Sequence, residues 1–322
     1  MNSLLLKQLM ELTEEEKAIV EQNKEVRKDF YTSQTNFVIE SEKFLNKNKM
    51  ITARKHTRFI DFPKHTHNYI EINYVLNGKL KQKIGNENMT LKKGELLFLN
   101  QHIEHEISAC GENDIIINFI IQPHFFDYIF HYLNGENIIT DFLINSLYNS
   151  TQNGHYLYFT VADVEEIQGI ISKILMEELN PSSFTESTIK LYMGLLIIEL
   201  VKNNDKIKRN EDSILQHFIV VESLKYIDEN YQLGTLNELA AMLKQTSSSL
   251  SKQIKRATGY TYKELQQEKR LAKAKELLQT TDLPIRTIIE EVGYDNISYF
   301  YRLFKEKYIV TPKQYRCEEA TK

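Results

Sequence analysis

The sequence contains few cysteines and no long apolar segment, and each absence excludes a class of protein. The two cysteines among its 322 residues, Cys110 and Cys317, form no CxxC pair. A disulfide framework is therefore not expected, and a reducing compartment suits the chain. No apolar run approaches the roughly 20 residues that a membrane span needs, and the first residues lack a signal-peptide pattern. We expect a cytoplasmic protein that does not associate with membranes.

Several enzyme signatures are also missing. The sequence shows no nucleophilic triad, no P-loop and no dinucleotide-binding fingerprint, so we do not expect an enzyme. Its length and its hydrophobic content of 42% are sufficient for more than one core, because single domains usually span roughly 100–200 residues.

Charge is divided unevenly along the chain. The formal net charge is −4, yet residues 217–317 contain 16 Lys and Arg against 12 Asp and Glu. Residues 1–216 contain 23 basic and 30 acidic side chains. A basic part that follows an acidic part is the asymmetry expected of a sensor joined to a nucleic-acid-binding module.

Local patterns divide the chain into four parts and predict an α+β multidomain protein. Thr13 and Glu16 form a capping box in the charged, helix-prone first part. Short alternating runs separated by glycine turns then predict a small antiparallel barrel or sandwich. A helical segment follows and ends in a charged linker at 202–212. In order, the parts are a helical extension, a β-barrel, a helical segment with its linker, and an all-α domain: residues 1–49, 50–122, 123–212 and 213–318.

The last part contains two helix-turn-helix patterns. Thr235 and Thr261 each begin a capping box, and Gly259 suits the left-handed conformation that ends a helix. The pattern recurs without a gap at a spacing of 50 residues. The aligned pairs are Leu250 with Phe300, Lys252 with Arg302, Ile254 with Phe304, Lys255 with Lys305, and Thr261 with Thr311.

The helix predicted between the two helix-turn-helix patterns has a length close to the spacing of successive major-groove faces on DNA. A helix of about 20 residues is about 30 Å long, and successive major-groove faces lie roughly 34 Å apart. One chain could therefore place two recognition helices in adjacent major-groove segments of one duplex.

Three segments carry a resemblance to a known family: LSKQIKRATGYTYKEL (250–265), KRLAKAKELL (269–278) and IIEEVGYDNISYFYRLFKEKYIVTPKQYR (288–316). They resemble the AraC/XylS family of transcription regulators. Two positions depart from that pattern, because Ile254 stands where Phe is usual and Ile289 where Ala is usual. The second departure affects the packing expected for the second helix pair.

The resemblance implies a set of DNA-contacting residues on the two recognition helices. Lys255 and Lys305 are expected to hold phosphates together with backbone amides at helix starts. Arg302 suits bidentate binding of guanine. For an isolated lysine, a solvated surface is the alternative interpretation. The residues expected at base edges are Ser248, Ser251 and Lys252 on the first helix, and Ile297, Ser298, Tyr301 and Arg302 on the second.

A second resemblance lies within the predicted barrel. His65, His67 and Glu71, followed later by His105, are similar to the cupin pattern HxHxxxE…G and G…H. Residues two apart on a strand share a face, so the first three of these project together with Asn73. The resemblance implies that the two histidines, the glutamate and the later histidine can bind a divalent metal.

Three roles remain open for His65, His67, Glu71 and His105. They could hold a divalent metal, bind a small polar effector such as a sugar, or serve the structure alone. AraC-like sensor domains often resemble cupins without using a metal, so no cofactor is required and a divalent metal remains an alternative.

These patterns predict a ligand-responsive transcription regulator, which is more often an activator in the resembling family. The expected partners are double-stranded promoter DNA, RNA polymerase, a small-molecule effector, and a second copy of the chain bound through the amphipathic segments 164–179 and 186–201. The alternatives are a cupin-type metal-dependent enzyme or metal sensor fused to a DNA-binding module, and a regulator that is active without any effector.

Overall fold

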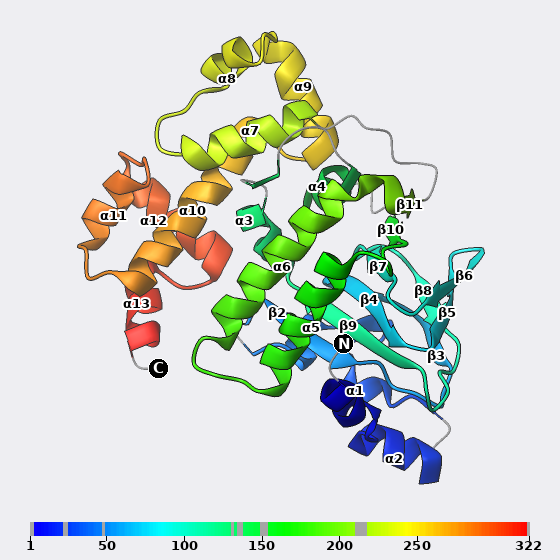
Figure 1. Cartoon of the computed structure of the whole chain (residues 1–322). Helices are drawn as coiled ribbons and strands as arrows, with labels where there is room; N and C mark the ends of the chain where they lie inside the picture. The colour runs from blue at the N-terminus through cyan, green and yellow to red at the C-terminus, as the bar shows by residue number, and fades with distance from the viewer. Residues whose placement is uncertain are drawn as a thin grey trace. The chain divides into compact units, whose positions relative to one another are not determined.

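The computed structural model describes residues 3–21, 25–46, 49–129, 132–133, 138–148, 154–209 and 218–320. The chain forms two compact units, Met1–Leu215 and Gln216–Lys322. Each has its own buried apolar core, and Figure 1 follows the chain through both. The predicted fold class, an antiparallel barrel with flanking helices before an all-α domain, is confirmed.

Two facing β-sheets make up the first unit. Their strand orders are β11-β10-β7-β4-β9-β2 and β1-β3-β8-β5-β6. Described neighbours pair antiparallel, except β1 with β3. The strands are β1 (Val38–Ile39), β2 (Ile51–Lys55), β3 (Phe62–His67), β4 (Ile70–Asn77), β5 (Lys79–Ile84), β6 (Glu87–Lys92), β7 (Leu96–Leu99), β8 (His105–Ile107), β9 (Ile115–Ile121), β10 (Tyr156–Phe159) and β11 (Ile207–Arg209).

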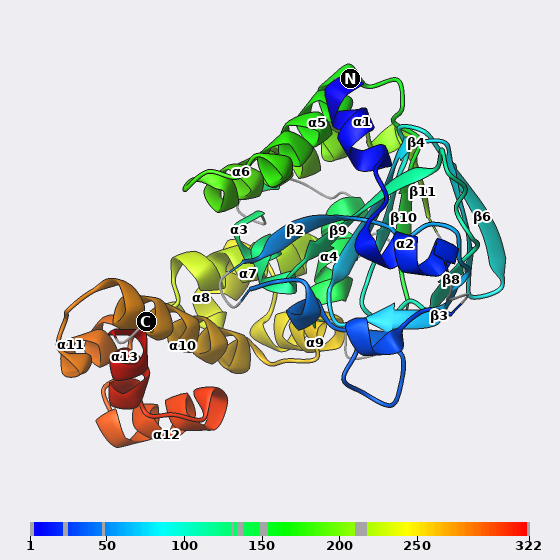
Figure 2. The same ribbon diagram turned by 90° about the horizontal axis from the view of Figure 1, so that it is seen from below.

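Strand β4 lies inside the six-stranded sheet and is buried on both faces. Glu71, Asn73 and Val75 face the space between the sheets, because side chains alternate along a strand. Tyr74 faces the other way and donates a hydrogen bond to Gln168 of α5, with 2.6 Å between oxygens. Helices α5 (Glu165–Leu179) and α6 (Thr185–Lys202) lie side by side against this outer face (Figures 1 and 2).

The two sheets include strands from both sides of the predicted barrel segment. The short strand β1 comes from the predicted helical extension, whereas β10 and β11 come from the predicted helical segment. The predicted linker at 202–212 is structured as far as Arg209, because β11 pairs with β10; residues 210–212 lie outside the described residues. Strands of two to four residues are too short for periodicity to distinguish them from loops.

Short helical elements complete the first unit. Among the described residues they include α1 (Ser3–Met10), α2 (Glu14–Glu21), α3 (Phe126–Ile129), α4 (Ile138–Tyr148) and 3₁₀ turns at Lys28–Phe30, Ser41–Lys43, Pro123–Phe125 and Asn204–Lys206. The predicted capping box before α2 is confirmed: the Thr13 amide donates to Glu16 at 2.9 Å and the Glu16 amide donates to the Thr13 hydroxyl at 3.1 Å.

Glu16 also fastens α2 to the barrel through a buried ion pair. Its fully buried carboxylate accepts from Arg58 Nε at 2.8 Å and from Lys55 Nζ at 2.8 Å. Burial alone would raise the pKa of Glu16, but the hydrogen bonds from Arg58 and Lys55 outweigh burial and lower the pKa to about 2. The N-terminal helices are therefore attached by a charge that the barrel itself neutralises.

The described residues of the second unit, 218–320, form helices throughout most of their length. Helices α8 and α9 make the first helix-turn-helix pair, α11 and α12 make the second, and α10 connects them. Their bounds, with the flanking helices, are α7 (Phe218–Glu229), α8 (Leu236–Met242), α9 (Ser247–Thr258), α10 (Tyr262–Thr280), α11 (Ile285–Glu291), α12 (Ile297–Tyr308) and α13 (Pro312–Ala320). Both predicted capping boxes, at Thr235 and Thr261, are confirmed.

The repeat at a spacing of 50 appears in the packing. Leu250 and Phe300 are both fully buried, as are Ile254 and Phe304. Ile289 is also buried and belongs to the core of the second helix pair. Both departures from the family pattern therefore sit in apolar cores.

The repeat also fixes the ends of the two recognition helices. The side chains of Thr246 and Asn296 cap α9 and α12 by accepting from backbone amides. Gly259 ends α9 with φ of 76°, and Ile309 ends α12 with φ of 69°. At the end of α12, a β-branched residue thus adopts a backbone conformation that favours glycine.

Glu16→Gln should make the fold less stable and less sensitive to acid. Because the pKa falls from 4.5 to about 2, the carboxylate stabilises the native state above about pH 4.5, and this contribution is lost as the pH falls toward 2. We expect a loss of about 3 kcal/mol at pH 7, measured by urea unfolding between pH 7 and 3. Equal pH dependence in both proteins would contradict the role of this pair.

Ile309→Gly should stabilise the second unit by about 1 kcal/mol, because left-handed backbone costs a β-branched residue about that much. The Ile309 side chain is 78% exposed, so little packing is lost. Denaturation followed by circular dichroism measures the change. The matched control, Gly259→Ala, should be destabilising, and a destabilised Ile309→Gly protein would refute the argument.

Candidate functional site

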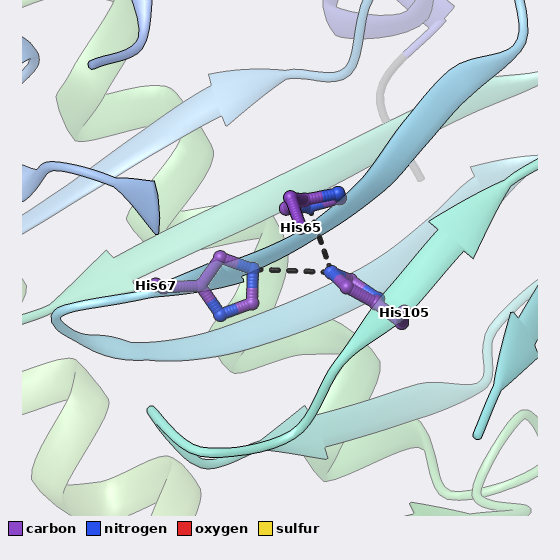
Figure 3. Close-up of side chains that lie close together, drawn as sticks. All are labelled: His65, His67 and His105. Atoms are coloured by element: carbon purple, nitrogen blue, oxygen red, sulfur yellow. Dashed lines mark hydrogen bonds between the residues drawn. The ribbon is translucent and has the colours of Figure 1, made fainter. Parts of the chain in front are cut away.

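Three histidines meet between the two sheets of the first unit. His65 and His67 lie on β3, and His105 lies on β8 directly opposite His65. The Nε2 atom of His105 is 2.8 Å from Nε2 of His65 and 3.1 Å from Nε2 of His67 (Figure 3). All three side chains are buried. The structure therefore brings together the three histidines that the sequence pattern selected.

Hydrogen bonds at the far side of two rings fix their tautomers. His65 Nδ1 lies 2.8 Å from the Pro63 carbonyl, and His105 Nδ1 lies 2.9 Å from the Gln82 side-chain oxygen. Both partners are acceptors, so each Nδ1 carries the hydrogen and each Nε2 presents a lone pair. Two lone pairs then face each other at 2.8 Å, an arrangement that a shared cation would stabilise.

Glu71 reaches this cluster from β4 of the opposite sheet. Its Oε2 atom is 3.5 Å from His67 Nε2 and 3.8 Å from His105 Nε2. A chain of amides links it to the histidines across the sheets: Gln82 donates to Asn73 at 3.2 Å, and Asn73 donates to Glu71 at 3.0 Å. All four predicted residues therefore form one cluster.

Burial governs the protonation of this cluster. It lowers the pKa of His65 to about 4 and those of His67 and His105 well below their usual range. Burial also raises the pKa of Glu71 to about 7, partly offset by the hydrogen bond from Asn73. Neutral imidazoles are the form that binds metals. The three imidazoles offer nitrogen atoms within 4.8 Å of one another, and the Glu71 carboxylate lies beside two of them; such donors suit a divalent transition metal. His67 Nδ1 has no partner among the described residues.

A small cavity adjoins the cluster. The space between its wall atoms amounts to about 340 Å³, which includes open solvent. The part that is wide enough to hold a molecule has room for about one water. His65 and Glu71 line it, whereas His67 and His105 do not. The wall also contains polar and aromatic side chains that the sequence patterns did not indicate: Tyr31, Arg54, His56, Thr57, Phe62, Tyr69 and Asn118.

A carboxylate from the N-terminal helices reaches the same wall. Glu15 of α2 accepts hydrogen bonds from Tyr31 at 2.7 Å, Thr57 at 2.9 Å and Arg54 at 3.0 Å. These partners are 16, 42 and 39 residues away in the chain. No local spacing could have indicated this contact. The basic run Arg54-Lys-His-Thr-Arg58 was the one available signal.

The predicted DNA-contacting residues lie on the two recognition helices. Ser251 and Tyr301 are half-buried, and Tyr301 packs on the core of its helix pair. Arg302 is exposed, lies over the Tyr299 ring at 5.2 Å and is 3.9 Å from Glu306. The remaining predicted residues are exposed: Ser248, Lys252 and Lys255 on α9, and Ile297, Ser298 and Lys305 on α12.

Each unit matches a family model. Residues 239–318 match the model described as a helix-turn-helix domain, and residues 50–124 match the model described as an AraC-like ligand binding domain. The two models occur here in the order sensor, then DNA-binding module. This chain belongs to the AraC/XylS family of transcription regulators. The resemblance in the three C-terminal segments is thereby confirmed.

Curated relatives of this AraC/XylS regulator include proteins matched along their length or in one part. The transcriptional activator RhaS of Mannheimia succiniciproducens is 25% identical over 274 residues, which cover 85% of this chain and 96% of RhaS. The xylose operon regulatory protein of Haemophilus influenzae is 38% identical over 99 residues, or 30% of this chain and 26% of that protein.

Solved structures similar to this AraC/XylS regulator include ToxT from Vibrio cholerae. ToxT is 15% identical with a TM-score of 0.33, and the match covers 84% of this chain and 98% of ToxT. The C-terminal domain of the response regulator yesN from Fusobacterium nucleatum is 38% identical with a TM-score of 0.28, covering 29% and 93%. None of the described helices is long and apolar enough to cross a membrane.

Proposed function

We propose that this chain activates transcription when a small polar effector, such as a sugar, binds inside the barrel. The observation that carries the DNA-binding half is the repeated pair of capped, exposed recognition helices separated by the 19 residues of α10. At 1.5 Å per residue, α10 is about 28 Å long, close to one DNA turn. Two relatives support this proposal. RhaS is named a transcriptional activator, which supports activation, and the xylose operon regulatory protein supports a sugar as the effector.

We assign the effector site to the cavity and the cluster beside it. His65, His67, Glu71 and His105 supply polar atoms from both sheets, and aromatic rings line part of the wall. Such a mixture of convergent polar groups and aromatic surface suits a small polar molecule. An effector acts on DNA binding only if it binds two conformations of the chain differently.

We place the protein in the cytoplasm, acting on promoter DNA together with RNA polymerase, and we propose no catalytic activity. On α9, Ser248, Ser251 and Lys252 take the base-reading role, and Lys255 holds phosphate. On α12, the base-reading residues are Ile297, Ser298, Tyr301 and Arg302, with Lys305 at phosphate.

Arg302→Ala and Lys305→Ala should affect DNA binding differently. Losing a bidentate arginine should relax preference at one base position, by about 1–3 kcal/mol. Losing a phosphate contact should weaken binding to all DNA sequences similarly, and it should reduce the slope of log affinity against log salt concentration by about 1. Gel-shift titrations on an operator library at several salt concentrations measure both. Lys313→Ala, an exposed lysine outside both recognition helices, is the control. Identical behaviour of the first two variants would refute the assigned roles.

We also propose that the chain forms a homodimer through α6. One face of this helix leaves apolar side chains in solvent: Leu191 is 75% exposed, Leu195 is 43% exposed, and Phe184 at the helix start is 73% exposed. Apolar side chains that cluster on a surface commonly mark an interface, and a symmetric pair of chains suits repeated DNA sites.

Leu191→Glu combined with Leu195→Glu should convert the dimer to a monomer, because the two charges would be desolvated at the interface. Sedimentation velocity at micromolar concentration measures the mass. Leu233→Glu is the matched control, since Leu233 is 85% exposed in the other unit. Unchanged mass in the double variant would exclude this face, and a monomeric wild-type protein would exclude the dimer.

A divalent metal at the histidine cluster is a second candidate, favoured by the two lone pairs that face each other. His65, His67, His105 and Glu71 would hold it, and the metal would supply a Lewis-acidic contact for an effector. Gln82 would orient His105 through its Nδ1 hydrogen bond. The chain would then be a metal sensor or would use the metal to bind its effector.

Protein purified without chelator should contain about one metal ion per chain if this candidate is correct. Elemental analysis for Zn, Mn, Fe and Ni measures the content. His105→Ala should abolish it, whereas His124→Ala, at an exposed histidine, should not. Clearly substoichiometric amounts of all four metals in the wild-type protein would exclude the metal.

A further inference from the structure

The hydrogen-bond donors around Glu15 form an arrangement suited to a free carboxylate. Arg54 supplies a positive charge, while Tyr31 and Thr57 supply two hydroxyl donors, all within 3.0 Å of the Glu15 oxygens. Charge-assisted hydrogen bonds of this kind are the strongest that proteins make to anions. The Arg54 guanidinium is further held over the rings of Tyr31 and Phe44, at 4.8 and 4.7 Å. These donors are positioned by the barrel and its aromatic wall.

Glu15 itself comes from outside the barrel wall. It lies on α2, whose attachment depends on the neighbouring Glu16 and its separate pair with Arg58 and Lys55. The Glu15 side chain could therefore leave its donors while α2 remains attached. The Glu15 carboxylate therefore occupies a group of hydrogen-bond donors that lie outside its own helix.

The donor set opens directly into the cavity. Tyr31, Arg54 and Thr57 all belong to the cavity wall, together with His65, Glu71 and Asn118. His56 lies in the same wall, and its buried Nε2 atom has no hydrogen-bond partner among the described residues. A polar molecule bound here would therefore meet an unsatisfied imidazole nitrogen beside the three donors.

Space and charge together restrict what can bind. With Glu15 in place, the cavity has room for about one water molecule, so a larger effector must displace a side chain. A neutral molecule that displaced Glu15 would leave the Arg54 guanidinium without its carboxylate partner, which is costly for a charge that is largely enclosed. A molecule with its own carboxylate replaces every lost interaction.

We propose that Tyr31, Arg54 and Thr57 form an anion subsite for the carboxylate of a small effector, and that Glu15 is its internal competitor. This inference rests on the proposed function, because it names the chemical class of the effector for the same cavity. Effector binding would exchange one carboxylate for another and release the side chain of Glu15 from the barrel.

Acetate is the probe that tests the subsite without knowledge of the effector. In the full chain, Glu15→Ala should vacate the donors, so that sodium acetate raises the melting temperature relative to sodium chloride at equal ionic strength. A concentration ten times the dissociation constant should give a shift of roughly 3–6 °C. Acetamide, which has the same shape without the charge, should give none.

Three further proteins make the result specific. Wild-type protein should respond at least tenfold more weakly, since its tethered carboxylate competes at high effective concentration. Glu14→Ala, at the adjacent exposed glutamate that pairs with Lys17, should behave as wild type. Adding Arg54→Gln to Glu15→Ala should abolish the response. If Glu15→Ala does not fold, Glu15→Gln keeps the size of the side chain and should show a smaller shift.

The outcomes separate this inference from the proposed function. Folded Glu15 variants that respond equally to acetate and acetamide, or to neither, would overturn the anion subsite while leaving DNA binding unaffected. Wild-type protein that binds every duplex with the same affinity would overturn the proposed function, whatever acetate does.

Discussion

A polar group enclosed in an apolar core is costly unless it finds a partner, and this cost organises most of the polar interior of the barrel. The chain from Glu71 through Asn73 and Gln82 to His105 joins the two sheets by hydrogen bonds. Apolar packing surrounds it on several strands. Because the amides are mutually satisfied, the imidazole and carboxylate side chains are held in one arrangement before anything binds. The same network that links the two sheets thus preorganises the candidate site.

Hydrogen bonds and ion pairs also attach the N-terminal helix α2 to the barrel. Glu15 and Glu16 are adjacent on α2, yet they engage separate sets of donors on the barrel. Glu16 is fully buried and matched by two cations, whereas Glu15 retains some exposure, 18% of its side chain. One carboxylate therefore anchors the helix, and the other meets the cavity wall. Neighbouring residues of one type acquire separate roles from their surroundings.

Features whose determinants are local could be predicted from the sequence. The capping boxes at Thr235 and Thr261 involve residues three apart, and the repeat of 50 residues preserves buried positions. The histidine cluster was also accessible, since alternation on a strand groups His65 with His67. The sequence does not predict that β1, β10 and β11 join the sheets, because such short strands are defined by the strands they pair with. The contacts of Glu15 and the backbone at Ile309 depend on tertiary structure and left no periodic signal.

The length of helix α10 also limits how a DNA site for this protein can change. Its 19 residues run between the two recognition helices without a break, and it packs against α7, α9, α11 and α13. In the proposed mode of binding, α10 therefore sets the separation between the two DNA segments that one chain contacts. In that mode, an inserted base pair between the two segments would rotate one of them away from its recognition helix. In the proposed dimer, only the distance between the sites of the two chains is left for the promoter to vary.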